Sequence, residues 1–134
     1  MTTKELSSLY WLERDIADSE ERLEVMRVQA EPGASRSEGI LSGGSDVRAG
    51  EDIKIAIAEL SKHIDRMKSK ADRIRATIIR ETCYVDDPQM RLIIKYRVDG
   101  MPWHIVARKL GGGNTGDGCR MRFKRFMERQ NEQS

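Results

Sequence analysis

The sequence predicts an all-α protein in which a long antiparallel coiled-coil helix hairpin, residues 1–84, precedes a module of three short helices, residues 85–134. Apolar residues recur at heptad spacing over two long stretches, and a glycine- and serine-rich segment separates the two. In the last third, helix start and stop signals recur at short intervals. Only 5% of the residues are aromatic and 34% are charged, which favours long helices over a compact α/β enzyme.

The first long helix is expected from about Thr3 to Ala30, a stretch without Gly or Pro. Its apolar positions alternate three and four residues apart, and one serine interrupts them. This seam consists of Leu9, Leu12, Ile16, Ser19, Leu23, Met26 and Ala30. A narrow seam of this kind predicts that the helix lies along a partner helix.

Residues 31–50 hold five glycines, four serines and a proline, a composition that predicts a flexible loop. Its one apolar spot, Ile40-Leu41, is expected to be exposed to solvent.

A second long helix is expected from about Gly50 to Tyr84, with an unbroken heptad seam. The seam consists of Ile53, Ile57, Leu60, Ile64, Met67, Ala71, Ile74 and Ile78. Ile55, Ala56 and Ile79 lie beside this seam and widen its apolar surface. Because a single helix pair buries little surface, we expect further cover from the C-terminal helices or from a second copy, as a homodimer or higher homo-oligomer.

The first short helix should begin at Asp87-Pro88, an N-cap followed by a first-turn proline, and end near Val98 before Asp99-Gly100. Its apolar residues Leu92, Ile93 and Tyr96 are expected to share one side. In the second short helix, the spacing of a buried stripe is shown by Trp103, Val106, Ala107 and Leu110.

The third short helix, about 115–129, follows a triple glycine and is capped by Asn114 or Thr115. Its predicted buried stripe is Cys119, Phe123, Phe126 and Met127. The opposite face and its flanks are candidates for contact with DNA, because an α-helix fits the major groove and Arg and Lys reach phosphates and guanine edges. The candidate DNA-binding residues are Asn114, Thr115, Asp117, Arg120, Met121, Arg122, Lys124 and Arg125.

The charge distribution supports a basic C-terminal module. Residues 1–87 hold 14 Lys and Arg against 18 Asp and Glu, a net charge of −4. Residues 88–134 hold 10 against 4, a net charge of +6, and the two together give the total of +2. A basic module on an otherwise acidic chain is typical of a protein that binds phosphates.

One set of residues forms a known pattern: Asp87-Pro88, Arg91, Tyr96-Arg97, Asp99-Gly100-Met101, Trp103, Val106-Ala107 and Leu110-Gly111 before a basic last helix. This pattern resembles the sigma-factor region-four type of helix-turn-helix, and bacteriophage regulators of the ArpU and RinA type carry similar modules. The resemblance covers roughly the last 45 residues. It implies a phage or prophage regulator of transcription, acting on late genes.

The chain departs from that class at three places, one of which is a turn before the third helix that is longer than the common form. Members usually have Ser or Thr before the second helix, where this chain has Pro102, so no side-chain cap is expected there. Gly116 and Gly118 lie in the first turn of the third helix, where each should cost about 1 kcal/mol relative to alanine. We therefore expect the start of this helix to be loosely ordered without DNA.

Several other classes of protein are disfavoured. The triple glycine lacks the GK[ST] ending of a phosphate-binding loop, and His63 and His104 have no Cys or His at ligand spacing. No nucleophile and base stand in a catalytic pattern, so neither enzymatic activity, a metal nor a cofactor is expected. The absence of a long apolar run or a signal-peptide core predicts a cytoplasmic protein of a bacterial host cell, not a membrane protein. Cys83 and Cys119 are expected to be buried free thiols.

The function predicted from these observations is sequence-specific binding of double-stranded DNA by a phage transcriptional regulator, with RNA polymerase as a possible further partner. Arg120 and Lys124 are expected to face bases, and Arg122 and Arg125 phosphates. Two alternatives stay open. One is the small subunit of a phage DNA-packaging terminase, in which the DNA-binding module usually comes first. The other is a coiled-coil adaptor whose basic tail binds an acidic protein.

Overall fold

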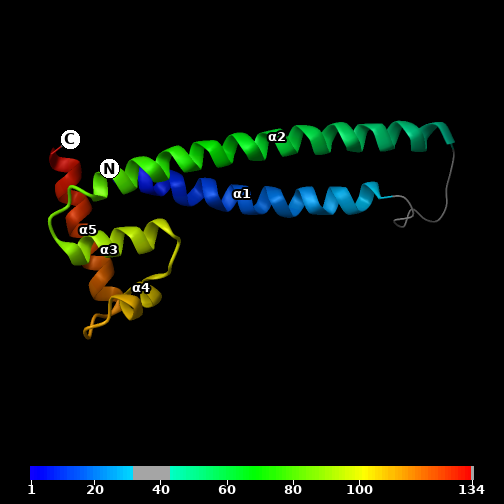
Figure 1. Cartoon of the computed structure of the whole chain (residues 1–134). Helices are drawn as coiled ribbons and strands as arrows, with labels where there is room; N and C mark the ends of the chain where they lie inside the picture. Colours follow the sequence, from blue (N-terminus) through cyan, green and yellow to red (C-terminus); the bar gives the residue numbers. More distant parts are fainter. Residues whose placement is uncertain (32–42, 134) are drawn as a thin grey trace. The chain divides into compact units, whose positions relative to one another are not determined.

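The computed structural model of the chain describes residues 1–31 and 43–133, and within them every regular element is an α-helix. The predicted all-α class is therefore confirmed. The helices are α1 (Thr3–Ala30), α2 (Gly43–Thr82), α3 (Pro88–Val98), α4 (Trp103–Leu110) and α5 (Gly116–Gln133), as labelled in Figure 1. In the described part of the chain, no helix is both long and apolar enough to cross a membrane.

The start of α2 corrects one prediction. The loop expected over residues 31–50 is wrong from residue 43 onward, because the backbone from Gly43 is already helical. Extending an existing helix costs much less than starting one, so the strongly patterned segment that begins at Ile53 can carry the helix backward through the glycines. Ile40-Leu41 lies outside the described residues.

The described residues form two compact units. The long-helix unit is residues 13–70, and the terminal unit is residues 1–12 together with 71–134. Neither unit coincides with the predicted division at residue 84, and the assignment of separate roles to residues 1–84 and 85–134 stays a prediction.

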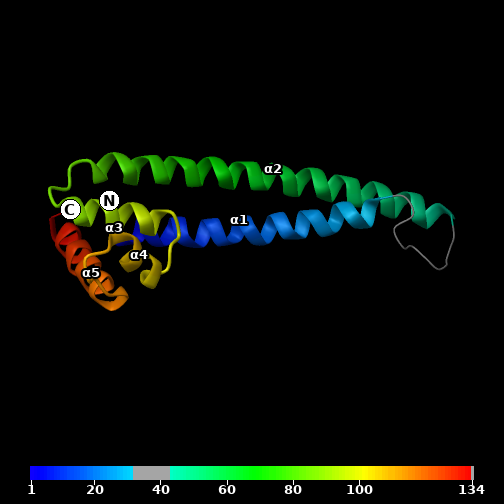
Figure 2. The ribbon, with the colours of Figure 1, turned by 60° about the horizontal axis from the view of Figure 1, so that its bottom comes forward.

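In the long-helix unit, the segments of α1 and α2 run side by side in opposite directions (Figures 1 and 2). Their predicted seams face inward, since Ile16, Ser19 and Leu23 of α1 and Ile64 and Met67 of α2 are all buried. Charge supports this pairing. Residues 13–24 hold six acidic and two basic residues, whereas residues 62–70 hold four basic and one acidic. One ion pair links the helices directly, with 3.2 Å between Lys68 Nζ and Glu20 Oε2.

The core of the terminal unit joins residues from α2, α3, α4 and α5. The largest fully buried side chains are Ile78, Thr82, Ile93, Ile94, Val106 and Cys119. Thr82 can lie there because its hydroxyl donates a hydrogen bond of 2.6 Å to the carbonyl oxygen of Ile78.

The buried side of α3 differs from the prediction. Leu92 was expected to lie on the apolar side, but 38% of its surface is exposed, and the buried residues are Met90, Ile93, Ile94 and Val98. Leu92 is two residues from Met90 and is therefore turned roughly 200° from it around the helix. Because α3 packs against both α4 and α5, its buried band is centred between Ile93 and Ile94.

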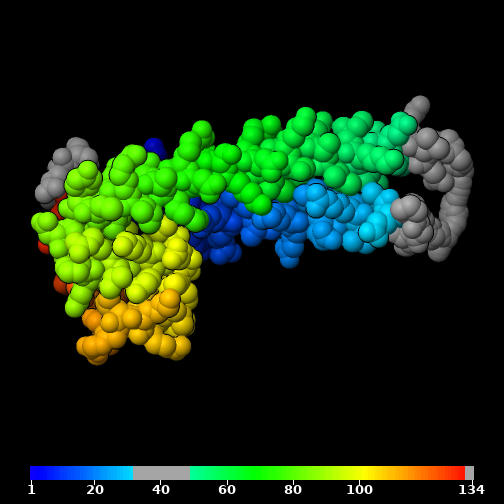
Figure 3. All heavy atoms as spheres, in the orientation of Figure 1, coloured from blue at the N-terminus to red at the C-terminus, as the bar shows by residue number. Residues whose placement is uncertain are grey.

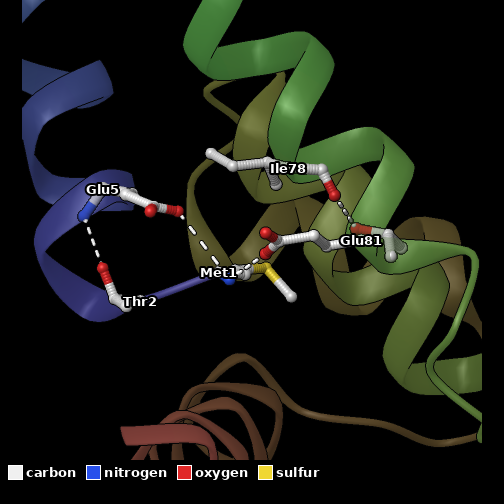
Figure 4. A network of polar contacts seen from close by, with 6 residues as sticks. Met1, Thr2, Glu5, Ile78 and Glu81 are labelled. Atoms are coloured by element: carbon white, nitrogen blue, oxygen red, sulfur yellow. Dashed lines mark hydrogen bonds and ion pairs between the residues drawn. The ribbon is translucent and has the colours of Figure 1, made fainter. Parts of the chain in front are cut away.

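The start of the chain is tied to the ends of α2 and α5 within the terminal unit. The amino group of Met1 forms ion pairs with Glu81 and, at 3.8 Å, with Glu5 (Figure 4). The amide nitrogen of Asn131 donates a 3.0 Å hydrogen bond to the hydroxyl of Thr3. These contacts connect residues at opposite ends of the sequence.

The two cysteines are free, but only one is buried. Cys119 is 1% exposed, as predicted, whereas Cys83 is exposed. Cys83 comes directly after the last residue of α2, and its thiol donates a 3.5 Å hydrogen bond back to the carbonyl oxygen of Ile79. The expected burial of Cys83 is wrong: α2 ends at Thr82, two residues before the expected end at Tyr84, and Cys83 lies outside the helix.

Candidate nucleic-acid interface

The start of α3 places the loop that precedes the three short helices. Asp87 is the N-cap, and its carboxylate accepts a 2.9 Å hydrogen bond from the backbone nitrogen of Gln89, while Pro88 occupies the first turn as predicted. The guanidinium of Arg91 donates hydrogen bonds of 2.5 and 3.2 Å to the carbonyl oxygens of Val85 and Asp86. The cap and the arginine together hold this loop against α3.

Helix α4 begins after Pro102, which makes no side-chain cap bond, as its chemistry predicts. Of the predicted buried stripe, Val106 and Ala107 are buried, while Trp103 and Leu110 are half-buried. The indole ring of Trp103 lies 5.4 Å from the ring of Phe123 in α5, centre to centre, at 58°. Aromatic contact thus contributes to the packing of α4 on α5.

Arg97 of α3 also contacts the ring of Trp103. Its guanidinium carbon lies 4.3 Å from the centre of the indole ring, and Nη1 donates a 2.7 Å hydrogen bond to the carbonyl oxygen of Met101. Burial lowers the pKa of the Arg97 guanidinium from its ordinary value, and Tyr10 of α1 acts in the opposite direction. Arginine remains charged at neutral pH in proteins, so Arg97 is a structural cation here.

The turn between α4 and α5 depends on its glycines. Gly111, Gly112 and Gly113 all have positive φ, and Gly111 combines a φ of 72° with a ψ of −160°, a region that essentially only glycine occupies. The side-chain nitrogen of Asn114 donates a 2.6 Å hydrogen bond to the carbonyl oxygen of Gly111 and closes the turn. This segment, orange in Figure 3, lies at the surface of the terminal unit.

Of the two residues expected to cap α5, Thr115 does so. Its hydroxyl oxygen accepts a 3.0 Å hydrogen bond from the backbone nitrogen of Gly118. The next residue, Gly116, packs against the first turn of α4, since a Cβ at this position would lie 3.2 Å from the backbone nitrogen of His104. Gly116 was expected only to weaken the helix, but its missing side chain also allows this close approach.

The two faces of α5 separate as predicted. Cys119 and Met127 are buried, and Phe123 and Phe126 are half-buried. Away from this stripe, the exposed residues include Asp117, Arg120, Lys124 and Arg125, whereas Met121 is half-buried. Asp117 and Arg120 form an ion pair with 2.9 Å between Oδ1 and Nη2. This pair places the Arg120 guanidinium beside the first turn of α5.

Three of the candidate DNA-binding side chains take part in the fold itself. Asn114 closes the turn and Thr115 caps α5, as described above. Arg122 is half-buried, and its Nη2 lies 3.6 Å from Oδ2 of Asp87, so it joins α5 to the N-cap of α3. Sequence reasoning could not find this ion pair because the two residues are 35 positions apart.

Sequence reasoning also passed over two exposed cations on α4, Arg108 and Lys109. The nitrogen of Lys109 lies 5.3 Å from the centre of the Tyr96 ring. Both residues belong to the last turn of α4 and were visible as a basic pair after the apolar stripe. They add two cations to those that α5 exposes to solvent.

Comparison with known proteins found no matching family model, no matching curated protein and no matching solved structure. Among the described residues, no group of three or more His, Cys, Asp or Glu is arranged to hold a metal ion. The chemistry that α4 and α5 offer is therefore that of exposed guanidinium and ammonium groups on short, closely packed helices.

Proposed function

We propose that the chain binds double-stranded DNA in a sequence-specific manner and regulates transcription in a phage or prophage, most directly at late genes. In this proposal, α3, α4 and α5 form a helix-turn-helix module, and α5 enters the major groove. The long helices α1 and α2 form a coiled-coil hairpin that serves assembly. Two copies would set the spacing of two half-sites, and RNA polymerase is a candidate further partner.

The observation that carries this proposal is the exposed face of α5. Arg120, Lys124 and Arg125 reach solvent on a helix whose other side is fixed by Cys119 and Met127 in the core. A helix that packs on the core with one side and carries cations on the other fits the major groove, where Arg and Lys can read guanine and neutralise phosphates. The net charge of +6 over residues 88–134 favours the same partner.

The cations differ in how free they are to bind DNA. We assign Arg120 and Lys124 to base edges and Arg125 to a phosphate. Arg120 must first leave Asp117, and Arg122, also expected at a phosphate, must share or leave Asp87. Lys124 and Arg125 are exposed and meet no such competition in the described part of the chain.

The test is binding of the purified chain to fluorescent duplexes from its own upstream region and to scrambled duplexes, at two salt concentrations. The Arg120→Ala/Lys124→Ala variant removes two cations from α5. The matched control is Lys4→Ala/Lys54→Ala, which removes two equally exposed cations from α1 and α2.

Tight binding to one duplex that survives moderate salt, is lost in the α5 variant and is kept in the control variant would support the proposal. Weak binding to every duplex that disappears steeply with salt would contradict sequence specificity, because phosphate neutralisation alone gives that dependence. Equal losses of DNA affinity in both variants would show that binding depends on net charge rather than on α5.

A further inference from the structure

The long-helix unit carries a second pair of faces, each opposite the buried seam of its helix. On α1, Val25 and Val28 are 55% and 49% exposed, and Glu21 lies four and seven residues before them. On α2, Ile55 is 56% exposed, and Lys62 and Arg66 follow it at intervals of seven and four residues. Residues spaced by three, four or seven share one side of a helix, so each set forms a single solvent-exposed face.

The cations on the α2 face repel one another within one chain, although Glu59 and Asp65 each lie three residues from Lys62. Lys62, Arg66 and Lys70 follow one another at four-residue intervals on α2, and like charges at this spacing destabilise a helix. On α1, Glu21 lies three residues from both Asp18 and Glu24. Within the described residues, no ion pair joins Glu21, Lys62, Arg66 or Lys70 to an opposite charge.

We propose that these two faces bind each other between copies of the chain. The solvent-exposed face of α1 in one copy, with Glu21, Val25 and Val28, packs antiparallel on the solvent-exposed face of α2 in the next copy, with Ile55, Lys62 and Arg66. The spacing of the residues supports this choice of occupant. Val28 is seven residues after Glu21, and Lys62 is seven residues after Ile55, so an alignment that places Val28 beside Ile55 also places Glu21 beside Lys62. Both intervals are about 10.5 Å along a helix.

The rest of this alignment is mixed, because it also brings the exposed carboxylates of Glu24 and Glu59 near each other. Val25 meets Ala58, an exposed small residue. Asp18 approaches Asp65, but Asp18 is already paired with Arg22 at 2.8 Å, and Arg66 adjoins Asp65 in the sequence. The contact thus joins apolar side chains at one end to opposite charges at the other.

A nucleic acid is the competing occupant of the α2 face, because Lys62, Arg66 and Lys70 form a basic row. It would leave Ile55 and the two valines of α1 exposed, whereas a second copy covers all three. The two faces of the proposed contact are different surfaces of the same chain. Such a head-to-tail contact continues from copy to copy until a ring closes, rather than stopping at a two-fold dimer.

The experiment measures self-association of the full chain by sedimentation velocity over a range of concentrations and at two salt concentrations. The variants are Glu21→Lys, Lys62→Glu and the double reversal. The matched control Lys54→Glu makes the same charge change on α2 but lies roughly 80° around the helix from Lys62. DNA binding of each variant is measured in parallel.

We expect the wild type to form salt-sensitive oligomers, each single reversal to weaken association about three- to tenfold, and the double reversal to restore it. Lys62→Glu removes the repulsion from Arg66 but places like charges three residues from Glu59 and Asp65, so helix content is measured beside association and should be kept while association falls. A variant that folds poorly would instead lose both helix content and association.

A wild-type chain that stays monomeric at every concentration would overturn the proposal, as would oligomers that the single reversals leave unchanged. Loss of DNA binding in Lys62→Glu with unaltered association would identify a nucleic acid as the occupant. The variants of α5 and the variants of Glu21 and Lys62 alter different residues. The experiments can therefore contradict DNA binding through α5 without contradicting the contact between copies, and they can contradict the contact without contradicting DNA binding.

Discussion

Gly116, the first residue of α5, lies against the backbone of His104 in the first turn of α4. A Cβ at Gly116 would come within 3.2 Å of the His104 nitrogen and of the carbonyl carbon of Trp103. Contacts this short to main-chain atoms cannot be relieved by rotating a side chain. A side chain at position 116 would therefore require the backbones of α4 and α5 to move apart by a few tenths of an ångström.

Substituting Gly116→Ala should destabilise the terminal unit. Overpacking costs roughly 1–3 kcal/mol, and the better helix propensity of alanine offsets about 1 kcal/mol of that. Urea unfolding of the full chain measures the net loss. The control is Gly50→Ala in α2, where an added Cβ meets nothing within 4 Å and should stabilise the chain by about 1 kcal/mol. A gain in both variants would contradict the close approach of α4 and α5.

Two substitutions of Asp87 should separate its cap from its ion pair. Asp87→Asn keeps a good N-cap acceptor but loses the charge that faces Arg122, and should cost less than about 1 kcal/mol. Asp87→Ala loses both and should cost about 1 kcal/mol more. Thermal unfolding of the two variants, beside Arg122→Ala, measures both contributions. Equal stability of the Asn and Ala variants would show that the cap contributes nothing.

Arg120 and Arg125 should respond differently when removed. Arg120→Ala should reduce discrimination between a cognate and a mutated duplex by about 1–3 kcal/mol, because a base contact is lost. Arg125→Ala should weaken every duplex alike and lower the slope of log affinity against log salt by about 1. Binding titrations at several salt concentrations give both quantities. An equal loss on all duplexes for Arg120→Ala would contradict its role at a base.

Ser19→Ala should stabilise the long-helix unit. Ser19 is 6% exposed within the apolar seam of α1, and its hydroxyl is hydrogen-bonded only locally, at 3.2 Å from Asp15. Alanine gains about 0.5 kcal/mol of helix propensity and puts a methyl group into the seam. Ser69→Ala, at an exposed site of α2, gains the propensity alone. Each substitution changes the free energy of unfolding, and the difference between the two changes measures the cost of the hydroxyl in the seam.

The predictions that held are those based on patterns within one helix. The bounds of the first helix, Thr3 to Ala30, and the start of α3 at Asp87-Pro88 were read from composition, spacing and cap chemistry, and are confirmed. Such signals act between residues a few positions apart, so they are present in the sequence. The DNA-contacting roles of the α5 residues remain predictions, because they concern a partner.

The predictions that failed depended on what surrounds a helix. Leu92 and Ile93 are adjacent and similar in chemistry, yet only Ile93 is buried, because α4 and α5 define which side of α3 is covered. The exposure of Cys83 goes with a helix that ends at Thr82, two residues earlier than expected. Neither outcome could be predicted from the sequence, because the spacing of the apolar residues fits several rotations of the helix about its axis nearly equally well.

Helical class, heptad seams and the basic C-terminal half all follow from the order of residues, since helix propensity, periodicity and charge are local or additive properties. The pairing of Arg122 with Asp87, the close approach of Gly116 to His104 and the contact of Asn131 with Thr3 were decided only by packing. Each joins residues that are distant in the sequence, and such contacts exist only once the chain has brought their helices together.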